Sequence, residues 1–205
     1  MDHPPRRRGR PRLLDREAGL ETAAKLFWRH GYEGTSIADL TQAMGISPPS
    51  LYATFGSKEN LYREAVAYAS EQGGSRLALL KGDASAYDGI AFYLHEVARE
   101  FANPALPPGC MVATAVLQHA QENEAAAGIA ADQRAATARI IQDRLDRAVA
   151  EGELPEGADT FTLTRFYMAV MQGMSAQACD GTCAETLRRM ADMALSVWPG
   201  QRQGT

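Results

Sequence analysis

Apolar residues recur at helical spacing along most of this chain, and no segment alternates apolar and polar residues as a strand would. Leu20, Ala23, Ala24 and Phe27 mark the first such segment, which we expect to open near Asp15 and to end at Gly31. Further helices are predicted over residues 37–44, 48–54, 58–80, 86–102, 110–120, 124–150, 159–179 and 183–198. The pattern therefore predicts an all-α fold of about nine helices.

Hydroxyl side chains precede three of these helices within some twenty residues. Ser36 and Asp39 have the spacing of a capping box, in which each side chain accepts the backbone N–H of the other residue. Ser47 stands before Pro48, and proline is favoured in a first helical turn. Ser57 follows a glycine and begins the next helix. Three local caps fix the starts of three helices.

Two short helices joined by a tight turn over residues 45–47 predict a helix-turn-helix at 36–55, whose second helix enters the DNA major groove. Leu40 and Ala43 of the first helix should pack inward against Leu51 of the second. The hydroxyl-rich remainder of the second helix is then free to contact DNA. Lys58 adds a cation at the N-terminus of the following helix, where backbone amides favour a phosphate.

A set of spaced motifs in this region resembles the DNA-binding domain of the TetR family of regulators, over about residues 13–73. They are Leu26-Phe27, Gly31-Tyr32, Gly34-Thr35-Ser36-Ile37, Gly45-Ile46-Ser47, Ser50-Leu51-Tyr52, Phe55-Gly56-Ser57-Lys58-Glu59 and Leu61. The resemblance implies DNA contacts by Tyr52 and Lys58, and a helical ligand-binding and dimerisation domain over residues 74–205. The DNA-binding candidates are Arg8, Arg10, Thr35, Ser36, Gln42, Ser47, Pro48, Pro49, Ser50, Tyr52, Thr54 and Lys58.

Charge is distributed unevenly along the chain. The formal net charge is −4, yet residues 1–63 carry ten Lys or Arg against seven Asp or Glu, and residues 64–205 carry eleven against eighteen. Residues 1–12 lack an apolar set to bury, so we expect a disordered basic arm. Its sequence Arg8-Gly9-Arg10-Pro11 is similar to the minor-groove core of an AT-hook. The alternative is a tail that supplies only non-specific, salt-sensitive attraction.

Aromatic and methionine side chains on the predicted helices 86–102, 110–120 and 159–179 are typical of a small-molecule cavity, although each could equally be ordinary core. The ligand-binding candidates are Phe92, Phe101, Cys110, Met111, His119, Tyr167, Met168 and Met171. Cys110 would lie in the first turn of a helix, where a thiol pKa falls. The motif Gly109-Cys110-Met111 also resembles that of a TetR subgroup with members that sense electrophiles or oxidants. The alternative for Cys110 is a small buried hydrophobe.

The predicted helix 159–179 has two apolar faces, so one of them could meet a second subunit. The dimer-interface candidates are Phe161, Met174, Leu187, Ala191, Ala194 and Trp198. The expected partners are a double-stranded, palindromic DNA operator, a second copy of the chain and a small-molecule effector. We expect a repressor released by that effector. The alternatives are a thiol-sensing repressor that acts through Cys110 and a structural, sequence-tolerant DNA-binding protein.

Enzyme motifs in the chain are incomplete. His95-Glu96 begins like a zinc-protease HExxH, but Arg99 stands where the second histidine is needed. Cys179 and Cys183 have no matching pair to complete a metal site, and no glycine-rich nucleotide fingerprint is present. We therefore expect no catalysis, cofactor or metal. No apolar run reaches the roughly 18 residues of a membrane span, and no secretory signal is recognised, so a cytoplasmic protein is expected.

Overall fold

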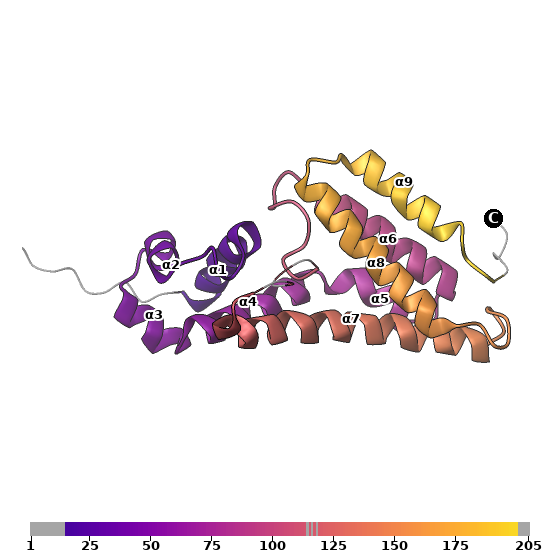
Figure 1. The fold of residues 1–205 in the computed structure, drawn as a ribbon, viewed down its shortest axis with the longest axis horizontal. Helices are drawn as coiled ribbons and strands as arrows, with labels where there is room; N and C mark the ends of the chain where they lie inside the picture. The colour runs from indigo at the N-terminus through magenta and orange to yellow at the C-terminus, as the bar shows by residue number, and fades with distance from the viewer. Residues whose placement is uncertain (1–14, 114, 116, 118, 201–205) are drawn as a thin grey trace, which may run out of the picture.

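A computed structural model describes residues 15–113, 115, 117 and 119–200, and these residues form helices without strands (Figure 1). Within them, nine α-helices and two short 3-10 helices follow one another. The elements are α1 Arg16–His30, α2 Ile37–Met44, α3 Pro48–Phe55, α4 Lys58–Gln72, η1 Gly74–Leu77, α5 Ala78–Lys81, α6 Ala86–Phe101, η2 Gln121–Asn123, α7 Glu124–Ala150, α8 Thr160–Cys179 and α9 Ala184–Leu195. The all-α prediction is confirmed. None of the described helices is long and apolar enough for a membrane span.

The predicted caps form at the first helices. Ser36 and Asp39 make a complete capping box at α2, and Gly45 ends that helix in the left-handed conformation with φ 66°. The hydroxyls of Ser47 and Ser57 accept the backbone N–H groups three residues further along, at the starts of α3 and α4. These local hydrogen bonds satisfy N–H groups that the helix itself leaves unpaired.

Two apolar cores hold the chain together. The first core lies among α1 to α4 and includes Phe27, Leu40, Leu51 and Leu61. The second core, among α5 to α9, is larger and includes Ile141. Figure 1 shows α1 to α3 gathered at one end of the molecule, hereafter the head, with α4 and the long α7 leading from it into the body. Ala43, expected to face inward, is exposed at the end of α2.

The predicted helix over 58–80 is interrupted. α4 ends at Gln72, and Gly73 and Gly74 lead into the 3-10 helix η1 before α5 begins. Glycine destabilises a helix interior by about 1 kcal/mol relative to alanine. The Arg76 side chain also lies over Gly73, where a Cβ would approach its Nη2 to 1.8 Å, and its Nε donates a hydrogen bond to the Gly73 carbonyl at 3.0 Å. A side chain at position 73 would displace the Arg76 guanidinium from this folded-back position.

The predicted helix over 110–120 is wrong, because the described residues of that segment form turns. Gly109 has φ 73° and packs so tightly on α8 that a Cβ there would lie 2.8 Å from the Ser175 carbonyl oxygen. The carbonyls of Val112 and Ala115 each accept a hydrogen bond from Arg134 Nη1 at 3.0 Å. A side chain on α7 thus binds carbonyls that a helix would pair internally.

A buried ion pair fastens the far end of the body. Arg144 on α7 is 2% exposed, and its Nη2 donates to the Glu153 carboxylate and, at 2.8 Å, to the Ala84 carbonyl. The other oxygen of Glu153 accepts the Ala86 N–H at the start of α6 at 2.6 Å. Burial raises the pKa of Glu153, but hydrogen bonds from Arg144 and Ala86 outweigh it and leave the pKa below its ordinary value. The pair joins α7, the segment after it and the start of α6.

Candidate nucleic-acid interface and adjoining cavity

The second helix of the helix-turn-helix, α3, has one buried and one exposed side. Leu51 and Phe55 are buried in the head and anchor the helix. Tyr52, on the opposite side, is 47% exposed. The turn before α3 is held by the Ile46 N–H, which donates to the Thr41 carbonyl at 3.1 Å. The fold therefore presents the start and outer face of α3 on a rigid support.

Most of the predicted DNA-binding residues are at least partly accessible to solvent. Ser36, Gln42, Ser47, Pro48, Pro49 and Tyr52 are exposed, and Ser50, Thr54 and Lys58 are partly buried. Thr35 is a correction, because its side chain is fully buried and its hydroxyl donates to the Gly31 carbonyl at 2.7 Å. It secures the corner between α1 and α2 and has no surface for DNA. Arg8 and Arg10 lie outside the described residues.

Lys58 stands at the N-terminus of α4 on an aromatic support. Its Nζ lies 4.2 Å from the centre of the Tyr32 ring, a cation–π contact. The Tyr32 ring in turn packs edge-on against Tyr62, with centroids 5.0 Å apart. Partial burial lowers the pKa of Lys58, and the nearby Glu33 carboxylate opposes that shift. The ring holds this cation beside the amides that open α4.

The excess positive charge of residues 1–63 is concentrated in residues 1–12. Residues 15–63 carry five Lys or Arg against six Asp or Glu, whereas residues 1–12 contain five arginines and a single aspartate. The folded head therefore has no excess of positive charge of its own. The excess lies in the segment 1–12, which is outside the described residues.

Two polar contacts join the head to the body. The Glu33 carboxylate, between α1 and α2, accepts hydrogen bonds from the Ala120 N–H at 3.1 Å and from Asn123 Nδ2 at 2.7 Å. These hydrogen bonds, that from Ala120 foremost, lower the pKa of Glu33. Trp28 Nε1 of α1 donates to the Pro108 carbonyl at 3.3 Å. The corner next to Lys58 is thus fastened to the segment that precedes α7.

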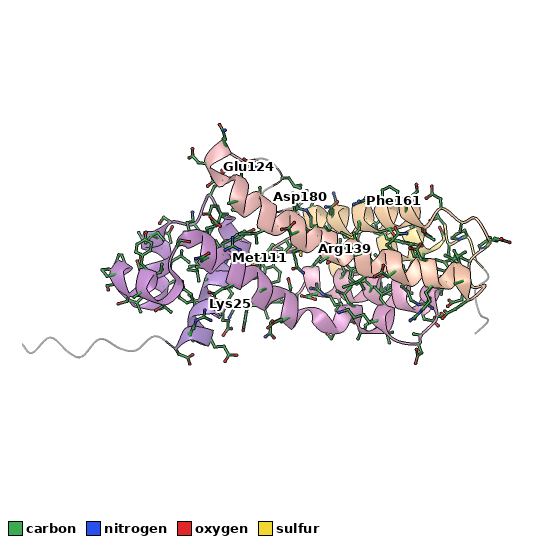
Figure 2. All side chains as sticks on the ribbon, turned by 90° about the horizontal axis from the view of Figure 1, so that it is seen from below. Lys25, Met111, Glu124, Arg139, Phe161 and Asp180 are labelled. Atoms are coloured by element: carbon green, nitrogen blue, oxygen red, sulfur yellow. The ribbon has the colours of Figure 1, made fainter. Side chains whose placement is uncertain are left out.

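A cavity of about 440 Å³ lies where the head meets the body. Its walls come from α1, α4, η1, α6, α7, α8 and the 103–113 segment. Met111, one of its lining residues, is labelled in Figure 2 at the junction of the two parts. The volume lies in the range of small-molecule sites, and the lining mixes apolar and polar side chains as such sites do.

Five of the eight predicted ligand-binding residues line this cavity: Phe101, Cys110, Met111, Met168 and Met171. Phe92 and His119 are on the surface, and Tyr167 is fully buried in the body core without reaching the cavity. Sequence reasoning missed Trp28, Tyr68, Arg76, Glu100 and Arg134 in the lining. They come from α1, α4, η1, α6 and α7, and no spacing in the sequence relates them.

Cys110 is a partly buried lining residue of the cavity rather than a helix-opening residue. Its backbone N–H donates to Ser175 Oγ on α8 at 2.9 Å, which fixes the chain at this point. Its thiol lies near enough to the Arg134 guanidinium to interact with it electrostatically. Because Cys110 does not open a helix, the helix-terminus argument for a reactive thiol fails.

Five of the six predicted interface residues are buried in the core of a single chain: Met174, Leu187, Ala191, Ala194 and Trp198. They pack the body and have almost no surface to offer a second copy. Phe161 differs, because it is 61% exposed near the start of α8 with the Arg165 guanidinium 5.1 Å from its ring centre (Figure 2). Phe166 is also exposed on the same helix.

Comparison with known proteins gives concordant matches. Residues 20–65 match the family model described as bacterial regulatory proteins, tetR family. The repressors ComR and BdcR of Escherichia coli (strain K12) are 34% and 32% identical and align over 94% and 91% of this chain and 92% and 90% of their own. Among solved structures, a cysteine mutant of the TetR family regulator CifR, complexed with 26 bp operator DNA, has a TM-score of 0.88 and 42% identity. That alignment covers 93% of this chain and 100% of the CifR chain.

Proposed function

Because the chain belongs to the TetR family of bacterial regulatory proteins, we propose that it is a ligand-responsive repressor that binds a palindromic operator as a homodimer. The observation that carries this proposal is the anchored α3 helix, which presents the exposed Tyr52 and the partly buried hydroxyls of Ser50 and Thr54, with Lys58 on its aromatic support at the start of the next helix. Residues 13–73 would form the DNA-binding domain and residues 74–205 the ligand-binding and dimerisation domain. We propose no catalytic step. We propose that the protein is located in the cytoplasm, where chromosomal DNA is accessible.

Some of the proposed contacts position the protein on the DNA backbone, and others read the base sequence. The hydroxyls of Ser47 and Ser50 and the ammonium of Lys58 suit phosphate oxygens, which fix the register of the protein on DNA. Tyr52 can place its ring against a base methyl group and its hydroxyl on a phosphate or a base edge. The exposed start of α3 has no Arg, Asn or Gln, so Gln42 on α2 is the amide available for a bidentate contact with adenine.

The release mechanism would use α4. This helix begins at Lys58 and ends at the cavity, where Tyr68 and Gln72 line the wall. A ligand that prefers one tilt of α4 would change the distance between the two reading helices of a dimer, which must match half-sites about 34–36 Å apart. Such a ligand acts only through its differential affinity for the two arrangements. The hydrogen bonds of Glu33 to the segment before α7 are a second route from body to head.

Operator binding should depend on Tyr52 and Lys58. We expect Lys58→Ala to weaken binding about tenfold. It should also reduce the slope of log affinity against log salt by roughly one per subunit, because each subunit loses one cation that neutralises a phosphate. Tyr52→Ala should cost about 1–3 kcal/mol per half-site, the usual cost of removing a side chain that reads a base. Footprinting on DNA that flanks the gene would identify the operator, and fluorescence anisotropy over a salt series would measure both quantities.

Lys81→Ala is the matched control, since it removes the same charge from an exposed position on α5. It should leave affinity and salt dependence unchanged. Absence of a protected palindrome, or equal effects of the variants at positions 58 and 81, would contradict the proposed DNA-binding surface.

A thiol-sensing version of the repressor is favoured by one observation: Cys110 lines the cavity, where a small electrophile would meet its thiol. The likeness of Gly109-Cys110-Met111 to the motif of a sensing subgroup also supports this version. An electrophile that enters the cavity would then alkylate Cys110 and displace the contacts around α4.

Alkylation of Cys110 by iodoacetamide should be faster than that of free glutathione at the same pH, and it should release the operator. Site-resolved mass spectrometry is required, because Cys179 and Cys183 are also exposed free thiols. A hydrogen bond with Thr186 lowers the pKa of Cys183, so total thiol loss alone would mislead. Cys110→Ser should keep operator binding and lose the response. A Cys110 rate no faster than that of glutathione eliminates the thiol sensor and leaves the reversible-ligand repressor standing.

A further inference from the structure

The charged side chains that line the cavity are paired with one exception. Three ion pairs form among them: Glu21 with Lys25 at 2.6 Å, Arg76 with Glu100 at 3.0 Å, and Glu96 with Arg99 at 2.7 Å. The seventh charged lining residue, Arg134, pairs with no carboxylate in the described part of the chain. The lining therefore carries one uncompensated positive charge.

Arg134 uses only part of its hydrogen-bonding capacity. Its Nη1 donates to the carbonyls of Val112 and Ala115, both at 3.0 Å. A guanidinium has five N–H groups, and those on Nε and Nη2 find no acceptor among the described residues. Nε and Nη2 form one edge of the planar group, the edge that binds a carboxylate through two parallel hydrogen bonds. Within the described part of the chain, this edge of the lining residue Arg134 has no partner.

Two ionisable groups, the Tyr62 hydroxyl and the Cys110 thiol, interact electrostatically with Arg134, and neither is a carboxylate. The buried Tyr62 hydroxyl, which interacts electrostatically with Arg134, has no hydrogen-bond partner in the described residues, and burial raises its pKa to about 12. Partial burial lowers the pKa of Arg134, in keeping with a cation whose water is only partly replaced. No acidic side chain among the described residues neutralises it, so an anion from outside the chain would meet a favourable site.

Part of the remaining wall is apolar. Phe101, Met111, Met168 and Met171 line the cavity and are buried. Methionine side chains adapt to ligands of irregular shape, and a volume of about 440 Å³ exceeds what an inorganic anion would fill.

We propose that the cavity binds a small amphipathic organic acid, whose carboxylate pairs with Nε and Nη2 of Arg134 and whose apolar part lies against Met111, Met168 and Met171. This inference rests on the proposed function only in treating the acid as the effector. Binding of the acid itself requires neither DNA nor a second subunit. A bidentate charge-assisted pair in a partly desolvated site gives the acid its advantage over a neutral analogue of the same shape.

Calorimetric titration of the full chain with 2-naphthoate, decanoate and their primary amides tests the proposal. At least one acid should bind ten times more tightly than its amide. Arg134→Gln should remove that preference and Arg134→Lys should retain part of it, since lysine keeps the charge but not the fork. Arg139→Gln is the matched control, because Arg139 is an exposed arginine on the same helix that does not line the cavity. It should leave the preference unchanged.

Arg134 also holds the carbonyls of Val112 and Ala115, so the melting temperature of each variant is measured alongside. Retained binding of the amide, or an unchanged melting temperature, shows that Arg134→Gln is folded. If Arg134→Gln is not folded, Arg134→Lys is used to test the preference for the acid. Equal binding of acid and amide, or no binding of either acid, overturns the inference. Operator binding by the ligand-free protein is measured separately. If the acids fail to bind while the operator binds, the acid site is wrong and the proposed repressor function stands. If the acids bind and the operator does not, the repressor function is wrong and the acid site stands.

Discussion

Replacing Arg144 with alanine should lower the free energy of unfolding by about 3–5 kcal/mol, because it leaves the partly buried Glu153 carboxylate without its partner. The same change frees the Ala84 carbonyl that Arg144 binds at 2.8 Å. Urea denaturation followed by circular dichroism would measure the loss. Arg139→Ala is the matched control on the exposed side of α7, labelled in Figure 2, and should change stability by less than about 0.5 kcal/mol.

The contribution of the Arg144–Glu153 pair should also depend on pH. The native pKa of Glu153 lies below its ordinary value of 4.5, so folding is stabilised fully above that pH and the gain is lost as pH falls through the native pKa. The difference between the wild type and Arg144→Ala should therefore shrink in acid. The double variant Arg144→Met/Glu153→Gln should be more stable than Arg144→Ala at neutral pH, since no unpaired charge remains. A loss equal to that of Arg139→Ala would contradict this account.

Deletion of residues 1–12 should weaken operator binding on the order of 100-fold near 0.15 M salt and flatten its salt dependence, by about 0.9 in slope for each phosphate that the protein no longer neutralises. The reason is the charge distribution: all of the excess positive charge of residues 1–63 lies in that segment. Fluorescence anisotropy against the operator over a salt series would give both quantities.

A full-length variant with glutamine at positions 6, 7, 8, 10 and 12 separates charge from chain length. It should behave like the deletion. A·T and G·C base pairs beside the half-sites distinguish two roles of the segment, since arginine is drawn into the narrow minor groove of A·T tracts. Preference for A·T flanks that disappears in the glutamine variant supports minor-groove binding by Arg8 and Arg10. Unchanged affinity and salt slope after deletion would show that the segment has no role.

The first helices of the head could be predicted from sequence because their signals are local. A cap such as Ser36, Ser47 or Ser57 bonds a backbone N–H three residues away, so spacing alone locates the helix start. The same holds for Gly45, which adopts a left-handed conformation that other residues resist. Charge counts along the chain likewise need no structure, and they indicated the importance of residues 1–12.

Tertiary contacts decided the segments where the predictions were wrong. Residues 110–120 have helical periodicity, yet Arg134 binds two of their carbonyls and Gly109 is pressed against α8. Thr35 carries a hydroxyl like its exposed neighbour Ser36, but it is buried in the corner after α1. Burial and side-chain bonds between distant segments outweigh local propensity, which differs by only about 1 kcal/mol per residue.

The sequence by itself determined the family, the helix-turn-helix and the separation of charge, because these depend on motifs and on neighbours a few residues apart. Only the tertiary structure decided the cavity. Trp28, Glu100 and Arg134 come from three helices, and no periodicity along the chain relates positions so far apart. The unpaired state of Arg134 is likewise a property of the assembled lining, since it depends on which carboxylates the other cations have already engaged.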